Sequence, residues 1–174
     1  MKITTERLEL IVSTLELAQA EIEDRYRFAQ LLDARVPVDW PPPLNDTDSM
    51  KWLLGFLEEH PDGTGWTNWY FVLRRDAAGE RCVIGNGGFK GKPSADGMVE
   101  VGYSIMQDRQ RQGFAPEAVA GLIGWAFSHP EVTRVAAETF PELRASIRVM
   151  EKNGLIYCGP GLEVGTIRYE RARS

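Results

Sequence analysis

The residues with the most specific chemistry form a short polar loop, Gln110-Arg111-Gln112-Gly113-Phe114-Ala115, at the start of an expected helix. Beyond this glycine, apolar residues from Ala115 to Phe127 recur at the spacing of one helix face. A helix that begins at such a loop presents free backbone N–H groups and the positive end of its dipole at one place. The loop is therefore predicted to bind an anion, and a phosphate group suits it.

The residue sequence of this loop does not match two common phosphate-binding motifs. A P-loop requires a Gly-Lys-Ser or Gly-Lys-Thr ending, which is missing here. A dinucleotide-binding fingerprint requires the pattern G-x-G-x-x-G, and this turn contains Gly113 alone. A nucleotide-binding module of either type is therefore an unfavourable interpretation.

The segment before the loop has the alternation of a strand. Apolar or aromatic residues occupy the odd positions from Val99 to Ile105, and mostly small or polar residues occupy the even positions from Glu100 to Met106. Successive side chains of a strand point to opposite faces. We therefore expect one face of this strand to be buried, with Glu100 and Ser104 together on the other.

Composition and charge narrow the class of protein. The chain has 174 residues, of which 43% are hydrophobic and 26% charged, as expected for one domain with a substantial core. A net charge of −5 argues against nucleic acid as a partner and is compatible with an amine substrate. The two cysteines and two histidines lack the spacing of a disulfide scaffold or a metal site. We expect no metal and reduced thiols in the cytoplasm. No run reaches the roughly 20 apolar residues of a membrane span, so no membrane partner is expected.

Strands and helices alternate along the rest of the chain. We expect strands over residues 4–12, 69–74, 82–89, 132–139, 155–158 and 166–170. Helices are expected from Thr14 onward, from about 46 to 60 and from 145 to 153, the last ending at Gly154. Three consecutive prolines make the segment 36–45 a loop.

The loop and its flanking elements resemble the Q/R-x-x-G-x-G/A segment of the GNAT acetyltransferases. Ser146 to Leu155, SIRVMEKNGL, resembles the S-x-R-V-x-E-K-x-G-F segment of their ribosomal-protein N-terminal acetyltransferase branch, and Thr5 to Leu8 resembles the opening of that branch. The resemblance covers nearly the whole chain. It implies an α/β (α+β) fold in a single domain, 1–174, with a mixed, mostly antiparallel sheet of about seven strands and helices on both faces. It also implies acetyl-CoA as the acyl donor.

The resemblance assigns the cofactor contacts of the loop. Successive backbone amides of the segment from Gln110 to Ala115 would wrap the pyrophosphate of acetyl-CoA. The side chains of Arg109 and Arg111 are either additional phosphate contacts or solvated loop residues.

The resemblance also places the cofactor arm beside Ser104, Ile105 and Met106, where it pairs with the strand backbone. A backbone N–H of Met106 or its neighbour would face the thioester oxygen and stabilise the oxyanion. Ser146 would either contact the cofactor or cap its helix.

Acetyl transfer to an amine needs a base, because an amine of pKa about 8 to about 10 is mostly protonated at neutral pH. Glu100 is the candidate, since relatives often have a catalytic glutamate near this position that acts directly or through water. The alternatives are a solvated or ion-paired strand carboxylate, or one that orients the amine. Met150 occupies the position of a tyrosine acid in many relatives, so no general acid is identified.

Acceptor selection is expected in the irregular segment from 36 to 70. Trp40 and Trp66 lie in expected loops and are predicted to line the acceptor pocket. Trp52 and Trp69 lie at helix and strand positions and are predicted to be core residues.

The predicted function is acetyl-CoA-dependent N-acetylation by direct attack of a primary amine on the thioester. The acceptor would be a protein N-terminus or a small amine such as an amino acid or an antibiotic. The alternative function is a non-catalytic acyl-CoA-binding or sensor domain of the same fold. A homodimer is compatible with the resemblance.

Overall fold

The computed structural model describes residues 1–174 and is built on one eight-stranded sheet. The strand order is β1-β2-β3-β4-β5-β6-β8-β7, and the pair β5–β6 is parallel while every other neighbouring pair is antiparallel. The mixed, mostly antiparallel sheet is as predicted. The strands are β1 (Lys2–Thr4), β2 (Leu8–Val12), β3 (Asn68–Leu73), β4 (Cys82–Phe89), β5 (Met98–Ile105), β6 (Arg134–Thr139), β7 (Ile156–Pro160) and β8 (Ile167–Ala172).

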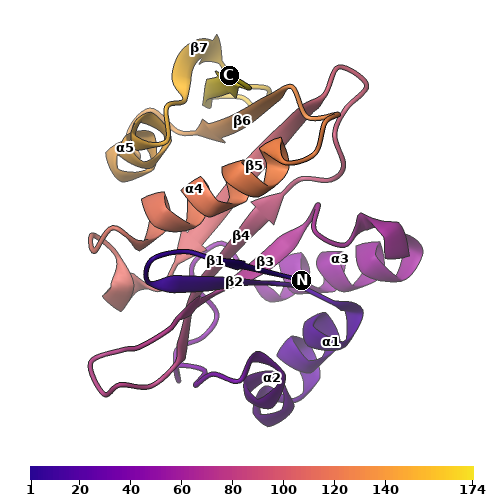
Figure 1. Ribbon diagram of the computed structural model, residues 1–174, viewed down its shortest axis with the longest axis vertical. Coiled ribbons are helices and arrows are strands. Elements are labelled where there is room, and N and C mark those ends of the chain that lie inside the picture. The colour runs from indigo at the N-terminus through magenta and orange to yellow at the C-terminus, as the bar shows by residue number, and fades with distance from the viewer.

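Helices cover both faces of the sheet, which confirms the prediction. On one face, α4 (Phe114–Phe127) and α5 (Arg144–Lys152) share the largest apolar core with the strands. On the other face, α1 (Leu15–Glu23) and α2 (Arg25–Leu32) pack against Tyr70 and Val72, and α3 (Thr47–Glu59) packs against α1. Figure 1 shows α4 across the middle of the molecule, with α5 toward one end of the long axis and α1 and α2 toward the other.

Two predicted elements near the N-terminus differ from the structure. The single strand expected over residues 4–12 is a hairpin of β1 and β2, closed by a bond from Thr5 N–H to the Leu8 carbonyl at 2.9 Å. The sheet therefore has eight strands rather than about seven. The helix expected after Thr14 is divided into α1 and α2 at Asp24, whose carboxylate accepts hydrogen bonds from the first N–H groups of α2. Tyr26, in the first turn of α2, is 73% exposed. The other expected elements are present, with small shifts of their ends.

Candidate active site

A gap opens in the sheet between β5 and β6. The two strands pair only over Met98 to Glu100 of β5. Beyond Glu100, β5 remains paired with β4 as far as Ile105, and β6 remains paired with β8 to its end. The facing edges of β5 and β6 therefore separate past Glu100, and part of the edge of β5 has no neighbouring strand.

The hydrogen bonds of β5 identify the backbone groups that point into this gap. Met106 N–H donates to the Ile84 carbonyl of β4 at 2.8 Å. Alternate residues of an antiparallel strand bond to the same neighbour, so even positions of β5 face β4 and odd positions, Tyr103 and Ile105 among them, face the gap. Of the two alternatives for the oxyanion contact, Met106 N–H is therefore excluded, because that group is bonded to β4. Its neighbour Ile105 has the gap-facing N–H.

The loop between β5 and α4 has the free backbone donors that an anion requires. Five consecutive N–H groups, from Arg111 to Ala115, have no hydrogen-bond acceptor within the chain. Arg111 has φ 61° and Gly113 has φ 84°, both in the left-handed region. Left-handed residues in such a turn let successive N–H groups converge on one concavity. These donors fit a pyrophosphate.

Glutamine side chains brace this loop while its amides stay free. Gln110 Nε2 donates to the Ile105 carbonyl at 3.1 Å, and Gln112 Nε2 donates to the Asp108 carbonyl at 2.9 Å. Both side chains therefore turn back toward the preceding segment. These two side chains therefore contribute to the site by holding the loop in its shape.

Arg7 ties the loop and α4 to the β1–β2 turn. Its Nη1 donates to the Gln112 carbonyl at 3.0 Å, its Cζ lies 4.4 Å from the ring centroid of Phe114, and its Nε pairs with Glu117 Oε2 at 2.7 Å. Although burial opposes it, hydrogen bonds from Thr5 and Arg7 lower the pKa of Glu117. The carboxylate in the first turn of α4 is thus neutralised by Arg7, so its repulsion of an anion in the loop is small.

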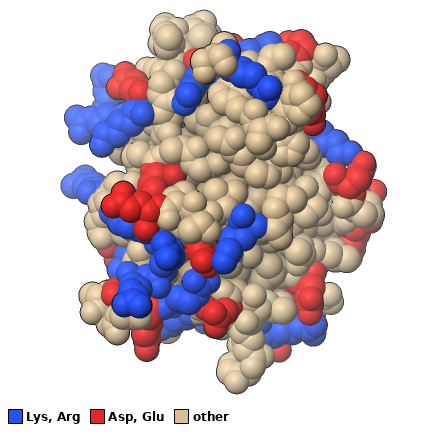
Figure 2. Space-filling model, viewed as in Figure 1, with Lys and Arg blue, Asp and Glu red and all other residues tan.

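Basic side chains border the loop on its outer side. A hollow of about 710 Å³ beside it has Arg7, Arg74 and Arg109 in its wall, together with acidic residues such as Glu6. Arg109 pairs with its neighbour Asp108 at 3.1 Å. Figure 2 shows basic side chains along the left-hand margin, the side on which α4 begins, with acidic side chains among them. The surroundings of the loop therefore have mixed charge.

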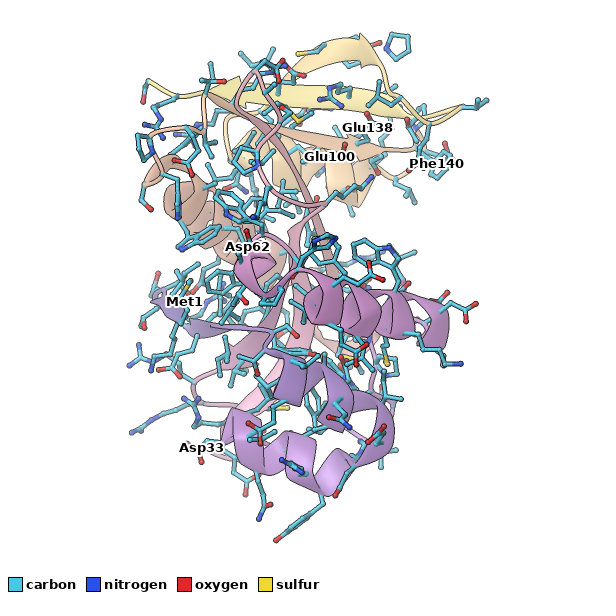
Figure 3. All side chains as sticks on the ribbon, turned by 90° about the vertical axis from the view of Figure 1, so that its right-hand side faces the viewer. Met1, Asp33, Asp62, Glu100, Glu138 and Phe140 are labelled. Carbon is cyan, nitrogen blue, oxygen red and sulfur yellow. The ribbon has the colours of Figure 1, made fainter.

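Glu100 lies at the closed end of the gap. Its side chain is 12% exposed, its Oε1 lies 2.5 Å from Lys90 Nζ, and its Oε2 lies 3.8 Å from Arg168 Nη1. The same Arg168 nitrogen pairs with Glu138 at 2.8 Å, and Figure 3 shows Glu100 and Glu138 side by side. Glu100 is thus an ion-paired carboxylate, located where β5 and β6 begin to separate.

Glu138 on β6 organises the loop between β7 and β8. It accepts hydrogen bonds from Leu162 N–H at 2.9 Å and from Thr166 Oγ1 at 3.0 Å. Burial opposes ionisation, but these bonds and Arg168 lower the pKa of Glu138 to about 2. No local sequence signal identifies Glu138, because its partners lie far along the chain.

Tyr103 reaches from β5 to α5 across the gap. Its hydroxyl lies 3.1 Å from Ser146 Oγ and donates to the Ser146 carbonyl at 3.2 Å. Leu143 is the N-cap residue of α5, so the interpretation of Ser146 as a cap is wrong. Burial raises the pKa of Tyr103, which keeps the phenol protonated at neutral pH. The sequence pattern showed Tyr103 only as a buried strand residue.

A pocket of about 340 Å³ lies on the face of β4 and β5 opposite α4. Its roof comes from α3 and the loop before it, and its floor comes from β3, β4 and β5. The roof residues are Leu44, Asn45, Ser49, Trp52 and Leu53, and the floor includes Thr67, Asn68, Asn86, Gly88, Lys90, Gly102 and Ser104.

Trp40 lies outside this pocket, contrary to the prediction. Its ring packs against Phe28 and Tyr70 at centroid distances of 5.9 and 6.4 Å, and its Nε1 donates to Glu21 Oε1 at 3.0 Å. Burial raises the pKa of Glu21, which also accepts from the Tyr70 hydroxyl at 2.6 Å. Trp40 is therefore a core residue that anchors the proline-rich loop.

Trp66 is also buried rather than in the pocket. It packs on the α4 side against Trp125 at 4.6 Å and Phe89 at 5.5 Å. Trp69 is fully buried, as predicted. Trp52, predicted to be a core residue, is 59% exposed and lines the pocket. The pocket tryptophan is thus the one on α3.

Comparison with known proteins identifies the family. The model of the acetyltransferase (GNAT) domain matches residues 14–156. The chain belongs to the GNAT acetyltransferases. It is therefore an acyltransferase, and the acyl donor of this family is acetyl-CoA.

Two curated relatives with similar sequences are named as N-acetyltransferases of Bacillus subtilis strain 168. YjdG, itself uncharacterised, is 26% identical over 152 residues, which cover 87% of this chain and 88% of that protein. YoaA, also uncharacterised, is 32% identical over 106 residues, which cover 61% of this chain and 56% of that protein.

Solved structures share the whole fold. RimL, the ribosomal L7/L12 alpha-N-protein acetyltransferase, solved with coenzyme A, has a TM-score of 0.67 and 18% identity, covering 99% of this chain and 98% of that one. Ribosomal-protein-S5-alanine acetyltransferase from Vibrio fischeri has a TM-score of 0.66 and 16% identity, covering 99% and 96%. None of the helices here combines the length and apolar character needed to cross a membrane.

Proposed function

We propose that this chain acetylates the α-amino group of a protein or peptide, with acetyl-CoA as the donor. One observation carries the proposal: the unpaired edge of β5 connects the free amides of Arg111 to Ala115 with the carboxylate of Glu100. Donor-binding groups and a candidate base thus lie at the two ends of one gap. RimL and the Vibrio fischeri enzyme, which share the fold, are named for acetylation of ribosomal proteins, and this favours a protein N-terminus over a small amine.

In the proposed site, backbone groups hold the donor. The N–H groups of Arg111 to Ala115 bind the pyrophosphate. The gap-facing backbone of Tyr103 and Ile105 pairs with the cofactor arm as it would with an added strand. Ser104 and Met106 direct their backbone groups to β4 and keep β5 in place. Bound acetyl-CoA supplies the acetyl group as a thioester.

Two side chains move protons in this proposal. The acceptor ammonium must lose a proton before its nitrogen can attack, and the Glu100 carboxylate takes that proton directly or through one water. Ion pairs with Lys90 and Arg168 hold this carboxylate at the closed end of the gap. The nitrogen then bonds to the thioester carbonyl carbon and the C–S bond breaks, while the Tyr103 hydroxyl, on the α5 side of the gap, gives a proton to the departing sulfur. The second proton that the acylated nitrogen loses restores the Tyr103 phenol. Tyr103 thereby fills the role that the apolar Met150 cannot.

The test is turnover with acetyl-CoA and a short peptide, read by thiol release and by the mass of the peptide. We expect one acetyl group on the α-amine. A matched peptide with a blocked N-terminus is expected to remain unmodified. Binding of acetyl-CoA without acetylation of any primary amine would refute the proposed activity and favour an acyl-CoA-binding domain.

A further inference from the structure

Two glycines lie in one row across the pocket floor, from β3 to the free edge of β5. Asn68 of β3 pairs with Gly88 of β4, which in turn pairs with Gly102 of β5. Residues paired across neighbouring strands share a face of the sheet. A Cβ at Gly102 would meet no atom within 4 Å, so the space above it is open. At Gly88 a Cβ would lie 1.6 Å from the Thr67 carbonyl oxygen, so the Thr67 backbone packs closely against this glycine. No side chain therefore stands in this row between Asn68 and β5, and the open space lies over Gly102.

Two buried polar atoms at the β3 end of this row make no hydrogen bond of normal geometry, although the Asn68 amide lies near the Tyr70 hydroxyl. They are Thr67 Oγ1 and Asn68 Nδ2, and both residues line the pocket. Thr67 is only 2% exposed. Buried polar atoms in native proteins are nearly always paired, because an unpaired one carries a full desolvation penalty. The pair therefore indicates a ligand group with an oxygen that accepts hydrogen bonds.

The charges around the pocket indicate that this ligand group is neutral. The residues lining the pocket include no carboxylate, and Lys90, their one charged side chain, is paired with Glu100 at 2.5 Å. A polyamine or an aminoglycoside would bring additional ammonium groups, which need anionic partners when they are buried. A peptide carbonyl is neutral and needs no anionic partner.

The spacing of the strands gives the distance between that group and the reacting amine. Neighbouring strands lie about 4.7 to 4.9 Å apart, so two steps from β5 to β3 span roughly 10 Å. An extended peptide advances at most about 3.3 to 3.6 Å per residue. A carbonyl bound at Thr67 and Asn68 thus belongs to about the third residue from an amine beside β5.

We propose that the acceptor is an extended peptide that lies across Gly102 and Gly88, with a carbonyl near its third residue bound by Thr67 and Asn68. This inference rests on the proposed function, because it assumes that an amine is acetylated beside β5. Thr67 and Asn68 act in specificity, at a distance from the reacting atoms. Activity should therefore depend on the length of the acceptor more than on its first side chain.

A length series of alanine peptides with amidated C-termini, from one to four residues, tests this inference. Wild-type kcat/KM is expected to rise about tenfold or more by the third residue, chiefly through KM, because the added contact forms on binding. Thr67→Val and Asn68→Leu remove the polar atoms with little change of volume. Each is expected to lower the ratio of tripeptide to one-residue kcat/KM toward one. Ser49→Ala is the matched control, since Ser49 lines the same pocket but its hydroxyl already bonds to Asp46 at 2.8 Å.

Other outcomes separate this inference from the proposed function. Equal kcat/KM for one-residue and three-residue acceptors would overturn the inference and leave the proposed acetyl transfer standing. A length dependence that both variants retain would overturn the roles of Thr67 and Asn68. Gly102→Val, which fills the open space above this residue, is expected to lose the tripeptide advantage while acetyl-CoA binding persists. A retained advantage would contradict the proposed path of the peptide across Gly102. If no amine is acetylated at all, the inference and the proposed function fail together.

Discussion

Gly113→Ala is the most informative change in the loop proposed to bind the pyrophosphate. Gly113 has φ 84° and directly precedes α4, and a Cβ added there would lie 3.2 Å from Arg7 Nη2. An alanine at this position either stays in the left-handed region under strain or pulls the loop toward ordinary backbone angles. The second response rotates the N–H groups of Arg111 to Ala115 away from their common concavity.

The expected magnitude follows from this backbone geometry. A residue with a Cβ in the left-handed region costs roughly 1–2 kcal/mol. If the loop keeps its shape, the free energy of unfolding falls by about that amount. If the loop relaxes in the free protein and is restored on binding, the same energy appears as about tenfold weaker acetyl-CoA binding.

Gly124→Ala is the matched control on the same helix. Gly124 is exposed and helical, and an added Cβ would meet no atom within 4 Å. Alanine there is expected to raise the free energy of unfolding by about 0.5–1 kcal/mol and to leave acetyl-CoA affinity unchanged. Calorimetric titration and denaturant unfolding measure the two quantities. Unchanged acetyl-CoA affinity together with an unchanged free energy of unfolding in Gly113→Ala would mean that the loop relaxed without any effect on the donor, and, with Gly124→Ala behaving as expected, this would refute the assignment of the phosphate site to this loop.

Three further changes test individual side chains. Glu100→Gln is expected to lower kcat about 100-fold with acetyl-CoA affinity intact, and unchanged activity from about pH 6 to 9 would remove Glu100 from the mechanism. Tyr103→Phe is expected to lower kcat about tenfold and to recover with an acetyl donor whose thiol has a lower pKa; equal losses with both donors would indicate packing instead. The pKa of Glu138 is about 2, against an ordinary glutamate value of 4.5, so its stabilisation is complete above about pH 4.5 and is lost as pH falls toward 2. Glu138→Gln should therefore flatten the decline of urea-unfolding stability between these pH values, and an unaltered decline would contradict its role.

Local sequence patterns predicted the parts of the site that local structure determines. The alternation before Met106, Gly113 at the turn and the helical spacing to Phe127 are properties of neighbouring residues. They sufficed to predict the strand, the loop and the helix, and hence free amides at one junction. The family resemblance supplied the identity of the bound group, which periodicity alone does not contain.

Contacts between segments far apart in the sequence could not be predicted from these local patterns. Trp40 was predicted to line the pocket from a loop, yet its contacts with Glu21 and Tyr70 bury it in the core, whereas Trp52 was predicted to be a core residue and lines the pocket. The hydroxyl of Tyr103 meets Ser146 from 43 residues away. Which backbone groups of β5 face the gap depends on its register with β4, and register is set by the whole sheet.

The first measurement to make is a calorimetric titration of the wild-type chain with acetyl-CoA, in parallel with CoA and ATP. The free amides beside α4 and the open edge of β5 predict one acetyl-CoA per chain with micromolar affinity, similar binding of CoA, and much weaker binding of ATP. The absence of acetyl-CoA binding by a folded sample, or tighter binding of ATP, would contradict the central claim that this junction is the donor site.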